Sequence, residues 1–390
     1  MKRLATIIDF NNIAIRAMFT CKYFGDGSVQ NFDTKEECNI LVRKIATDLS
    51  LIIRTFTPDR VIIAIDAKNP WRNAIYKDID GKGYKGNRLK DEDKNWDNIY
   101  SAFKEIETIF GNYGMVVTKL KNTEADDLAV LWRNYLMKDG FDVIMVSSDK
   151  DWTQLVNFDN ETKQFCIAYN PIAVKQLKKL YVSSDFVKWY SDENSVTDIF
   201  LRNYDSIKNK LKNILSSNPK ISIEEIDANL VLMNKIMCGD DGDNIPSFFE
   251  FYNNGKKKRV TELRAKHIYE ALEIKSVSDL KNNANSGQLK EALEKELKTV
   301  IDIDFDKRLN RQRWLVELNP ELFPKEIIKS FEEHTKSVEN VGYIQSDKTT
   351  METFLKGTSF LTDEHKKIRE NSIFDDLKSL DKFSKSPALF

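Results

Sequence analysis

The sequence predicts a doubly wound α/β domain built on a parallel sheet. Three short runs are continuously apolar and rich in β-branched residues, as buried parallel strands usually are: LATIID (4–9), RVIIAID (60–66) and FDVIMVSSD (141–149). The segments 37–56 and 95–114 lie between these runs and repeat apolar residues at steps of three and four. Strands that alternate with helices in this way are typical of a parallel sheet flanked by helices.

Both helical segments follow the helix period. In 37–56, one face carries Ile40, Leu41, Ile45, Leu49, Ile52 and Ile53. The segment 95–114 repeats this pattern and stops at glycine, a usual residue at a helix end. We therefore expect two amphipathic helices that cover the sheet.

Each of the three strand runs ends in an aspartate: Asp9, Asp66 or Asp149. Ligands of open α/β sheets bind beyond the carboxyl ends of the strands, so these three side chains are expected at the ligand-binding edge. Further acids occur in the motifs EADD, SSDKD and GDDGD, namely Glu124, Asp126, Asp127, Asp151, Asp240 and Asp243. Glu124 and Asp127 are three residues apart at a predicted helix start, so they share a face.

A cluster of so many carboxylates needs positive charge. Two unit charges about 4 Å apart repel by roughly 4 kcal/mol at an effective dielectric constant of about 20. Carboxylate oxygens suit Mg²⁺ or Mn²⁺, and two such ions about 3.5–4 Å apart are the arrangement that hydrolyses phosphodiesters. A single pair such as Glu124 and Asp127 is more typical of a helix cap on a solvated surface, but the whole set favours a metal centre.

The composition excludes several classes of protein. The chain of 390 residues is 41% hydrophobic and carries 60 basic against 61 acidic residues, which indicates a globular protein without excluding a nucleic-acid partner. Four cysteines without metal-ligand spacing indicate free thiols in a reducing compartment. Asp9 interrupts the first apolar run too early for a signal peptide or membrane span, so we expect a cytoplasmic protein.

Five motifs, in order, resemble those of the flap endonuclease and 5′-nuclease family: IIDFNN, IDA…WR…YKGNR, EADDLAV, SSDKDWTQLV and GDDGDNIP. Within that family, IIDFNNIAI and SSDKDWTQL are most similar to the T-even phage ribonuclease H branch. The resemblance implies a PIN-like (Rossmann-like) fold. It also implies a Mg²⁺-dependent 5′→3′ exonuclease and flap endonuclease that acts on branched DNA or RNA–DNA hybrids and removes RNA primers in replication or repair.

The resemblance also implies roles for individual residues. Its metal-binding positions fall on Asp9, Asp66, Glu124, Asp126, Asp127, Asp149, Asp151, Asp240 and Asp243, with Asp126, Asp149 and Asp151 closest to two metal ions. Lys85 and Arg88 match residues of a helical arch (67–94) under which a single-stranded 5′ end passes. With Asp149 they are the expected catalytic residues, because cations there can neutralise charge on the scissile phosphate. Stacking faces for bases are expected from Trp71, Arg72, Tyr76 and Tyr84. Without the acids, 67–94 would be interpreted as a solvated loop.

The basic run after the last acids resembles the family's helix-three-turn-helix element, which holds duplex DNA by its backbone. Its cations, expected in a loop that enters a helix, are Lys256, Lys257, Lys258, Arg259, Arg264 and Lys266. A solvated surface or a localisation signal is the alternative. Ser247 and Phe248 follow the DNIP motif where relatives often have glycine. This departure argues against the potassium site of the family and favours lysine contacts.

These features divide the chain into four parts. They are a nuclease core (1–170), a helical insertion (171–230), a region with the last metal ligands and the helix-three-turn-helix element (231–330), and C-terminal helices with a tail (331–390). The tail segment 372–390 has helically spaced apolar residues. It is expected either to dock on the protein itself or to bind a sliding clamp or single-strand-binding protein.

We expect a monomer that does not bind membranes. Two other functions use the same scaffold. A non-catalytic protein that binds branched DNA should lack some of the acids. A small PIN-type endoribonuclease should lack the basic element after Asp243.

Overall fold

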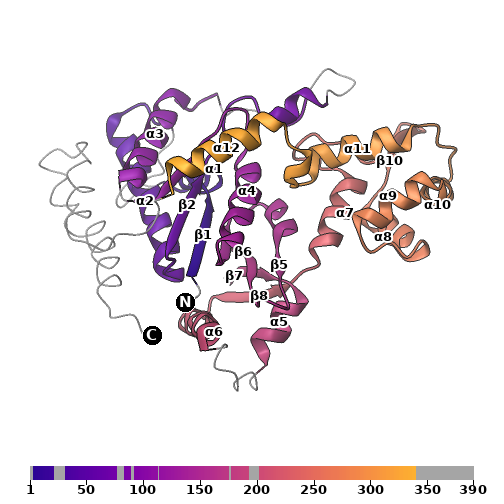
Figure 1. Cartoon of the computed structure of the whole chain (residues 1–390). Coiled ribbons are helices and arrows are strands. Elements are labelled where there is room, and N and C mark those ends of the chain that lie inside the picture. Colours follow the sequence, from indigo (N-terminus) through magenta and orange to yellow (C-terminus); the bar gives the residue numbers. More distant parts are fainter. Residues whose placement is uncertain are drawn as a thin grey trace, which may run out of the picture.

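The computed structural model describes residues 3–21, 31–76, 83–88, 92–112, 114–174, 177–192 and 202–339. A mixed sheet lies at the centre, helices cover both of its faces, and a smaller, mainly helical unit lies to one side (Figure 1). The strands follow the order β3-β2-β1-β4-β6-β7-β8, and β5 pairs with β6. Their bounds are β1 (Arg3–Asp9), β2 (Arg60–Ala64), β3 (Val116–Thr118), β4 (Phe141–Val146), β5 (Asn157–Phe158), β6 (Phe165–Val174), β7 (Leu177–Val182) and β8 (Ile221–Glu225).

The register of the central strands sets the position of the acids. Strand β1 pairs in parallel with β2, where Asp9 lies opposite Ala64, and with β4, where Ile8 lies opposite Val146. The chain therefore leaves β1, β2 and β4 at the same edge of the sheet. The strands predicted from 4–9, 60–66 and 141–149 are confirmed.

Two sets of helices cover the sheet. On one face lie α1 (Phe10–Thr20), α2 (Lys35–Phe56), α3 (Trp96–Asn112), α5 (Ser184–Ser191) and α6 (Arg202–Ser217). On the other lie α4 (Ala125–Lys138), α12 (Lys325–Ser337) and the 3₁₀ helices η2 (Lys150–Leu155) and η4 (Pro320–Leu322). Helices α2 and α3 confirm the two amphipathic helices expected from the sequence.

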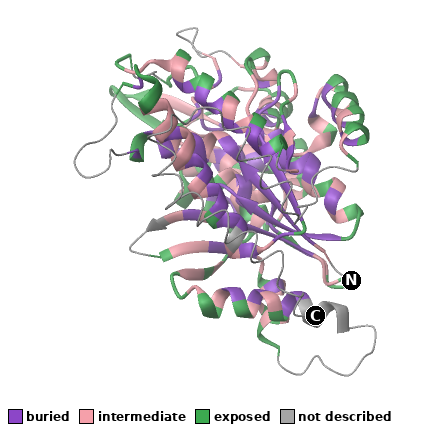
Figure 2. Cartoon of the chain, turned by 90° about the vertical axis from the view of Figure 1, so that its left-hand side faces the viewer, coloured by how far each residue is buried: buried purple, intermediate pink, exposed green. Residues whose placement is uncertain are grey.

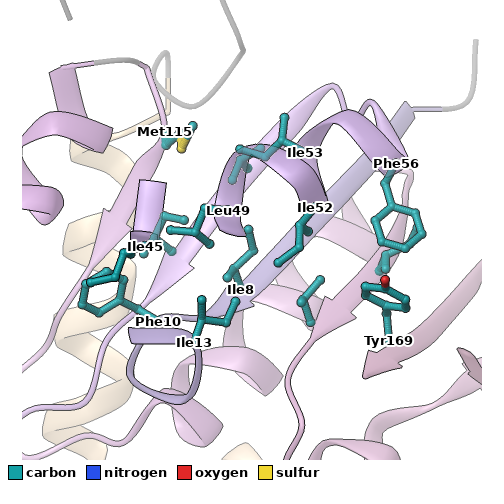
Figure 3. Close-up of a cluster of buried hydrophobic side chains, with 14 of the residues drawn as sticks. Ile8, Phe10, Ile13, Ile45, Leu49, Ile52, Ile53, Phe56, Met115 and Tyr169 are labelled. Carbon is teal, nitrogen blue, oxygen red and sulfur yellow. The ribbon is translucent and has the colours of Figure 1, made fainter. Parts of the chain in front are cut away.

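Successive residues of β1 serve opposite faces, as the strand period requires. Ile8 belongs to the core beneath α2, whereas Ile7 belongs to the core beneath α4. Figure 3 shows Leu49 and Ile52 of α2 above Ile8. The central strands β1, β2 and β4 are buried, while exposed residues gather on the outer surfaces of the helices (Figure 2).

The smaller unit follows the sheet in sequence. It contains α7 (Ala228–Cys238), β9 (Glu250–Asn253), β10 (Lys256–Arg259), α8 (Glu262–Ala271), α9 (Val277–Asn285), α10 (Gln288–Leu297) and α11 (Phe305–Val316). These elements enclose a third apolar core, which also includes Tyr84 from the arch segment. The smaller unit and the arch segment are therefore packed together.

Three expectations about secondary structure need correction. The segment 171–230 contains strands β7 and β8 as well as helices, because its alternating polar residues suit strands with one solvated face. Pairing of β6 with β5 and β7 is antiparallel, so the sheet is mixed. The cations Lys256–Lys258 lie on strand β10 of a hairpin and not in a loop, because Asn254 and Gly255 at positive φ form its turn.

Only part of the predicted arch (67–94) lies among the described residues. These contain the 3₁₀ helix η1 (Trp71–Ala74) and turns, whereas 77–82 and 89–91 lie outside the described residues, so the helical arch stays a prediction. The divisions after residues 170, 230 and 330 fall inside β6, α7 and α12, so they move to neighbouring loops. The tail 372–390, and with it the predicted partner peptide, lies outside the described residues.

Two findings bear on the sequence expectations about compartment. All four cysteines are free, as expected. Within the described residues, no helix combines the length and the apolar character that crossing a bilayer requires.

The packing of α2 against the sheet can be tested with two leucines of the same helix. Leu49 is fully buried above β1, whereas Leu51 is 45% exposed. Replacing Leu49 with alanine should lower the free energy of unfolding by about 2–5 kcal/mol, because a cavity remains in the core. Leu51→Ala is the matched control and should change it by less than about 1 kcal/mol. Urea denaturation measures both values, and equal losses would contradict the assigned packing.

Candidate active site

Asp9 lies where β1 ends and α1 begins. Its side chain accepts hydrogen bonds from the amide of Asn12 (3.1 Å), which caps α1, and from Ser147 Oγ (2.7 Å). Burial and the nearby carboxylate of Asp66 raise the pKa of Asp9 to about 7, although the two hydrogen bonds act in the opposite direction. Near neutral pH, Asp9 therefore exchanges a proton that an ordinary aspartate would already have lost, and a nearby cation would favour its ionised form.

Asp66 joins the end of β2 to helix α4. Its Oδ1 accepts a hydrogen bond from the amide of Ala125 (2.7 Å), the first residue of α4, and its own amide donates to Asn11 Oδ1 (3.0 Å). A carboxylate is favoured at the N-terminus of a helix. Burial nevertheless raises the pKa of Asp66. Asp66 thus holds the acidic end of α4 beside the strand ends.

The acids at the start of α4 have different partners. Asp127 is fully buried; its Oδ1 accepts from Arg72 Nη1 (2.7 Å), and its Oδ2 accepts from Trp71 Nε1 (3.1 Å) and the Glu124 amide (3.0 Å). Protein donors contact both oxygens, so Asp127 acts in this structure as a counter-ion, and its predicted metal-ligand role stays a prediction. Asp127 is the counter-ion that a buried arginine requires.

Asp126 faces the other acids. Its Oδ1 accepts a hydrogen bond from Trp152 Nε1 (2.6 Å). Burial, followed by the nearby carboxylate of Asp149, raises the pKa of Asp126 well above its ordinary value. A half-buried carboxylate with acidic neighbours is a suitable ligand for a divalent cation.

Asp149 and Asp151 follow the end of β4. Asp149 is exposed and caps η2, since its Oδ1 accepts a hydrogen bond from the Asp151 amide (2.9 Å). Burial and the carboxylate of Asp149 raise the pKa of Asp151 to about 7, although Lys235 opposes this rise.

Lys235 is a site residue that the sequence analysis misses. Its ammonium forms ion pairs with both Asp151 and Asp240, so it connects α7 to η2. Asp151, Asp240 and Asp243 also place one carboxylate oxygen each within 4.8 Å of one another. The ammonium of Lys235 therefore already lies between two of these acids. In the sequence, the signal for this role was the position of Lys235 in α7, the helix that leads directly into the GDDGD motif.

The arch segment adds two cations to the site. Lys85 pairs with Glu124 and lies 3.7 Å from Asp243, and Arg88 also pairs with Asp243. The backbone fixes this arrangement, because the Lys85 amide donates to the Asp243 carbonyl (2.8 Å). Lys85 and Arg88 therefore lie among the acids, and their predicted catalytic role requires this position.

Two residues predicted to contact nucleic acid are buried. Arg72 is 1% exposed, lies over the Trp71 ring at 4.6 Å from its centroid, and pairs with Glu124 as well as Asp127. Tyr84 is 6% exposed, and its hydroxyl lies 3.4 Å from Glu124 and 3.3 Å from Asp243. The acids draw both side chains inward, so the prediction of stacking faces at Arg72 and Tyr84 is wrong.

The β9–β10 hairpin presents its cations on two faces. Lys257 pairs with Glu250 and Arg259 pairs with Asp241, whereas the exposed Lys256 and Lys258 point to the other face of the strand. Two more predicted contacts begin α8: Arg264 donates to the Arg259 carbonyl (2.6 Å), and Lys266 lies 3.7 Å from Glu270. Of the predicted basic run, Lys256 and Lys258 are the most available to an anion.

The chemistry of the cluster suits a divalent metal ion. The predicted ligands converge from the ends of three strands, the start of α4, and the turn after α7. Their donors are all oxygens, which Mg²⁺ and Mn²⁺ prefer. Burial raises the pKa of Asp9, Asp66, Asp126 and Asp151, and repulsion by neighbouring carboxylates adds to this rise, so a bound cation would favour their ionised forms.

Comparison with known proteins agrees with this geometry. Residues 4–187 match the model of the 5′-3′ exonuclease N-terminal, resolvase-like domain. Residues 4–187 therefore carry the N-terminal domain of the 5′-3′ exonuclease family. A 5′-3′ exonuclease of Mycoplasmopsis pulmonis is 23% identical over 310 residues, which is 75% of this chain and 84% of that protein. With this domain the chain is a nuclease.

Two other similarities extend the comparison. DNA polymerase I of Streptococcus pneumoniae is 29% identical over 161 residues, which is 40% of this chain and 16% of that much longer protein. The solved structure of T5 5′-exonuclease with bound zinc ions covers 87% of this chain and all of its own, with a TM-score of 0.54 and 15% identity. The second similarity establishes the α/β PIN-like fold expected from the sequence.

Neighbouring aspartates at the start of α4 should respond to substitution with opposite signs. In the presence of a chelator at pH 7.5, Asp126→Asn should stabilise the protein, because the folded state raises the pKa of Asp126 and so disfavours its ionised form. Asp127→Asn should destabilise it by about 2–4 kcal/mol, because the buried Arg72 then keeps only Glu124 as a counter-ion, and this loss outweighs the gain from removing a carboxylate whose pKa burial raises. Urea unfolding measures both effects. The division of roles fails if Asp127→Asn unfolds no more easily than the wild type.

Proposed function

We propose that this nuclease hydrolyses phosphodiester bonds of branched DNA or RNA–DNA duplexes as a 5′→3′ exonuclease and flap endonuclease that depends on Mg²⁺ or Mn²⁺. The convergence of acids from five separate segments at one edge of the sheet carries the proposal. The family's N-terminal domain supports the reaction class. A non-catalytic binding protein is disfavoured. Such a protein would not require the complete set of carboxylates, whose ionisation lowers the stability of the folded state.

Six acids are proposed to hold the metal ions: Asp9, Asp66, Asp126, Asp149, Asp151 and Asp240. Two divalent ions held there would supply a water nucleophile at neutral pH and stabilise the leaving oxygen. Glu124 and Asp243 are proposed to act chiefly as the counter-ions that hold Lys85 and Arg88 in place.

Lys85 and Arg88 are proposed to face the scissile phosphate. Ion pairs with Glu124 and Asp243 orient them before substrate arrives, so little rearrangement accompanies the reaction. Their charges oppose the negative charge that grows on the phosphate oxygens. Lys235, between Asp151 and Asp240, is proposed to limit repulsion in the same group of acids before substrate binds.

The hairpin and helices of the smaller unit are proposed to hold the duplex. Lys256 and Lys258 on one face of β10 suit phosphate contacts, which position a duplex without reading its sequence. This arrangement would leave the reacting end of a strand at the acids. Removal of RNA primers in replication is the biological task that we propose for such an activity.

A panel of 5′-labelled substrates tests the reaction class. A flap, a nick and an RNA-primed duplex are each incubated with Mg²⁺ and with a chelator. Release of short 5′ products that stops in the chelator is expected, and the rates on the three substrates rank RNA against DNA and flap against nick. Cleavage that persists in the chelator would contradict the metal dependence.

Replacing Asp149 with asparagine should separate catalysis from binding. The amide retains the oxygen that caps η2 but loses the negative charge offered to a cation. Cleavage should fall by at least about 100-fold, with the affinity for a flap substrate changed by less than about threefold. Asp139→Asn, which alters an exposed acid paired with Arg3, is the control and should leave cleavage unchanged. Unchanged turnover in Asp149→Asn would remove this residue from the site.

The two faces of β10 provide a matched test of duplex binding. The double substitution Lys256→Gln and Lys258→Gln should weaken duplex binding and reduce the slope of log affinity against log salt by about 1.8, or about 0.9 for each phosphate contact. Lys257→Gln removes a charge that is already paired with Glu250 and should change the slope by less than half of that. Fluorescence anisotropy over a salt series measures both slopes, and an unaltered slope in the double variant would refute the proposed grip.

A further inference from the structure

A cavity of about 370 Å³ lies between α1, α2 and the β6–β7 hairpin, away from the acids. Three cations line it, Arg16 from α1, Lys44 from α2 and Lys178 from β7, together with one acid, Asp48 from α2. We refer to these four residues as the cationic pocket. None of them belongs to the sequence motifs of the nuclease site.

The charges of the cationic pocket do not balance. Arg16 lies 3.6 Å from Asp48 and Lys44 also pairs with it, so one carboxylate serves two cations. The third cation, Lys178, has a lowered pKa, because burial and the repulsion of Arg16 and Lys220 outweigh the attraction of Asp48. Three positive charges against one negative charge in a concave site leave an excess of two, which favours an anionic ligand.

The cationic pocket lies towards the edge of the sheet at which the acids gather. Strand β6 is parallel to β4, and its pairing with β7 continues to Val174, beyond Tyr169, which lies opposite the last residue of β4. The β6–β7 hairpin, which bears Lys178, therefore extends past the strand end that leads to Asp149. Arg16 lies seven residues along α1 from Asp9, or about 10 Å at 1.5 Å per residue.

Helix α2, which lines the cationic pocket, and helix α8, beside the proposed duplex grip, lie on opposite sides of α4. Figure 1 shows α2 to one side of the molecule and α8 to the other, with α4 between them. A nucleic acid held by the hairpin and α8 would enter the active site from the side of α8. Its continuation past the site would meet the cationic pocket.

We propose that the cationic pocket binds a backbone phosphate of the single-stranded 5′ segment, about three nucleotides beyond the scissile bond. This inference rests on the proposed function. The distance follows from about 10 Å along α1 and about 3.4 Å per stacked nucleotide. The planar guanidinium of Arg16 and the charges of Lys44 and Lys178 suit the oxygens of a phosphodiester. Asp48 is a positioning residue that orients Arg16 and Lys44.

The test compares flaps of one and ten nucleotides on the same duplex. Anisotropy in a chelator measures binding without cleavage for the wild type, Lys178→Gln and Arg16→Gln. For the ten-nucleotide flap, each variant should bind several-fold more weakly, with a salt slope lower by about 0.7. The one-nucleotide flap cannot reach the cationic pocket, so its affinity should be unchanged. Lys329→Gln, an exposed lysine of α12, is the matched control and should affect neither substrate.

The outcomes separate this inference from the proposed function. Equal losses on both flaps, or none on either, would overturn the assignment of the cationic pocket. If inorganic phosphate at constant ionic strength raises the melting temperature of the wild type but not of Lys178→Gln, while flap length has no effect, the ligand is free phosphate and the strand assignment is wrong. Failure of the wild type to cleave any flap with Mg²⁺ would overturn the nuclease proposal, whereas the binding data would still decide the role of the cationic pocket.

Discussion

Repulsion between carboxylates at one edge of the sheet is the constraint on which this structure depends. The parallel register of β1, β2 and β4 brings Asp9, Asp66 and Asp149 to that edge, and α4 and α7 add further acids. Burial raises the pKa of several of them, so the fold itself makes their ionisation unfavourable. Such an arrangement weakens the folded protein and suits a site for cations.

The protein's own cations divide the acids into two groups. Arg72 is fully buried between Asp127 and Glu124, and these ion pairs fix the start of α4 against η1. Lys85, Arg88 and Lys235 pair with Glu124, Asp243, Asp151 and Asp240. Asp9, Asp66 and Asp126 instead accept hydrogen bonds from uncharged donors, namely Ser147, Trp152 and backbone amides. The first group is structural, and the second is available to a metal ion.

Periodicity was sufficient to predict the central strands, α2 and α3, and the position of the acids, because burial on both faces of a parallel sheet leaves a strong apolar signal. It failed where one face is solvated: the lysines of β7 suggested a helix, and the turn residues Asn254 and Gly255 of the hairpin were overlooked. Side-chain roles were harder to predict. Arg72 and Tyr84 resemble surface residues in sequence, and only the packed structure shows that buried acids hold them inside.

Proton release on metal binding tests the central claim most directly. If the acids share protons in the metal-free protein, a divalent cation must displace them, because ligands bind in their ionised form. Calorimetric titration of the protein with Mn²⁺ at pH 6.5, in two buffers of different ionisation enthalpy, counts the protons released. We predict saturable binding with release of at least about one proton, since the pKa values of Asp9 and Asp151 are raised to about 7. Binding without proton release, or no binding, would contradict the account.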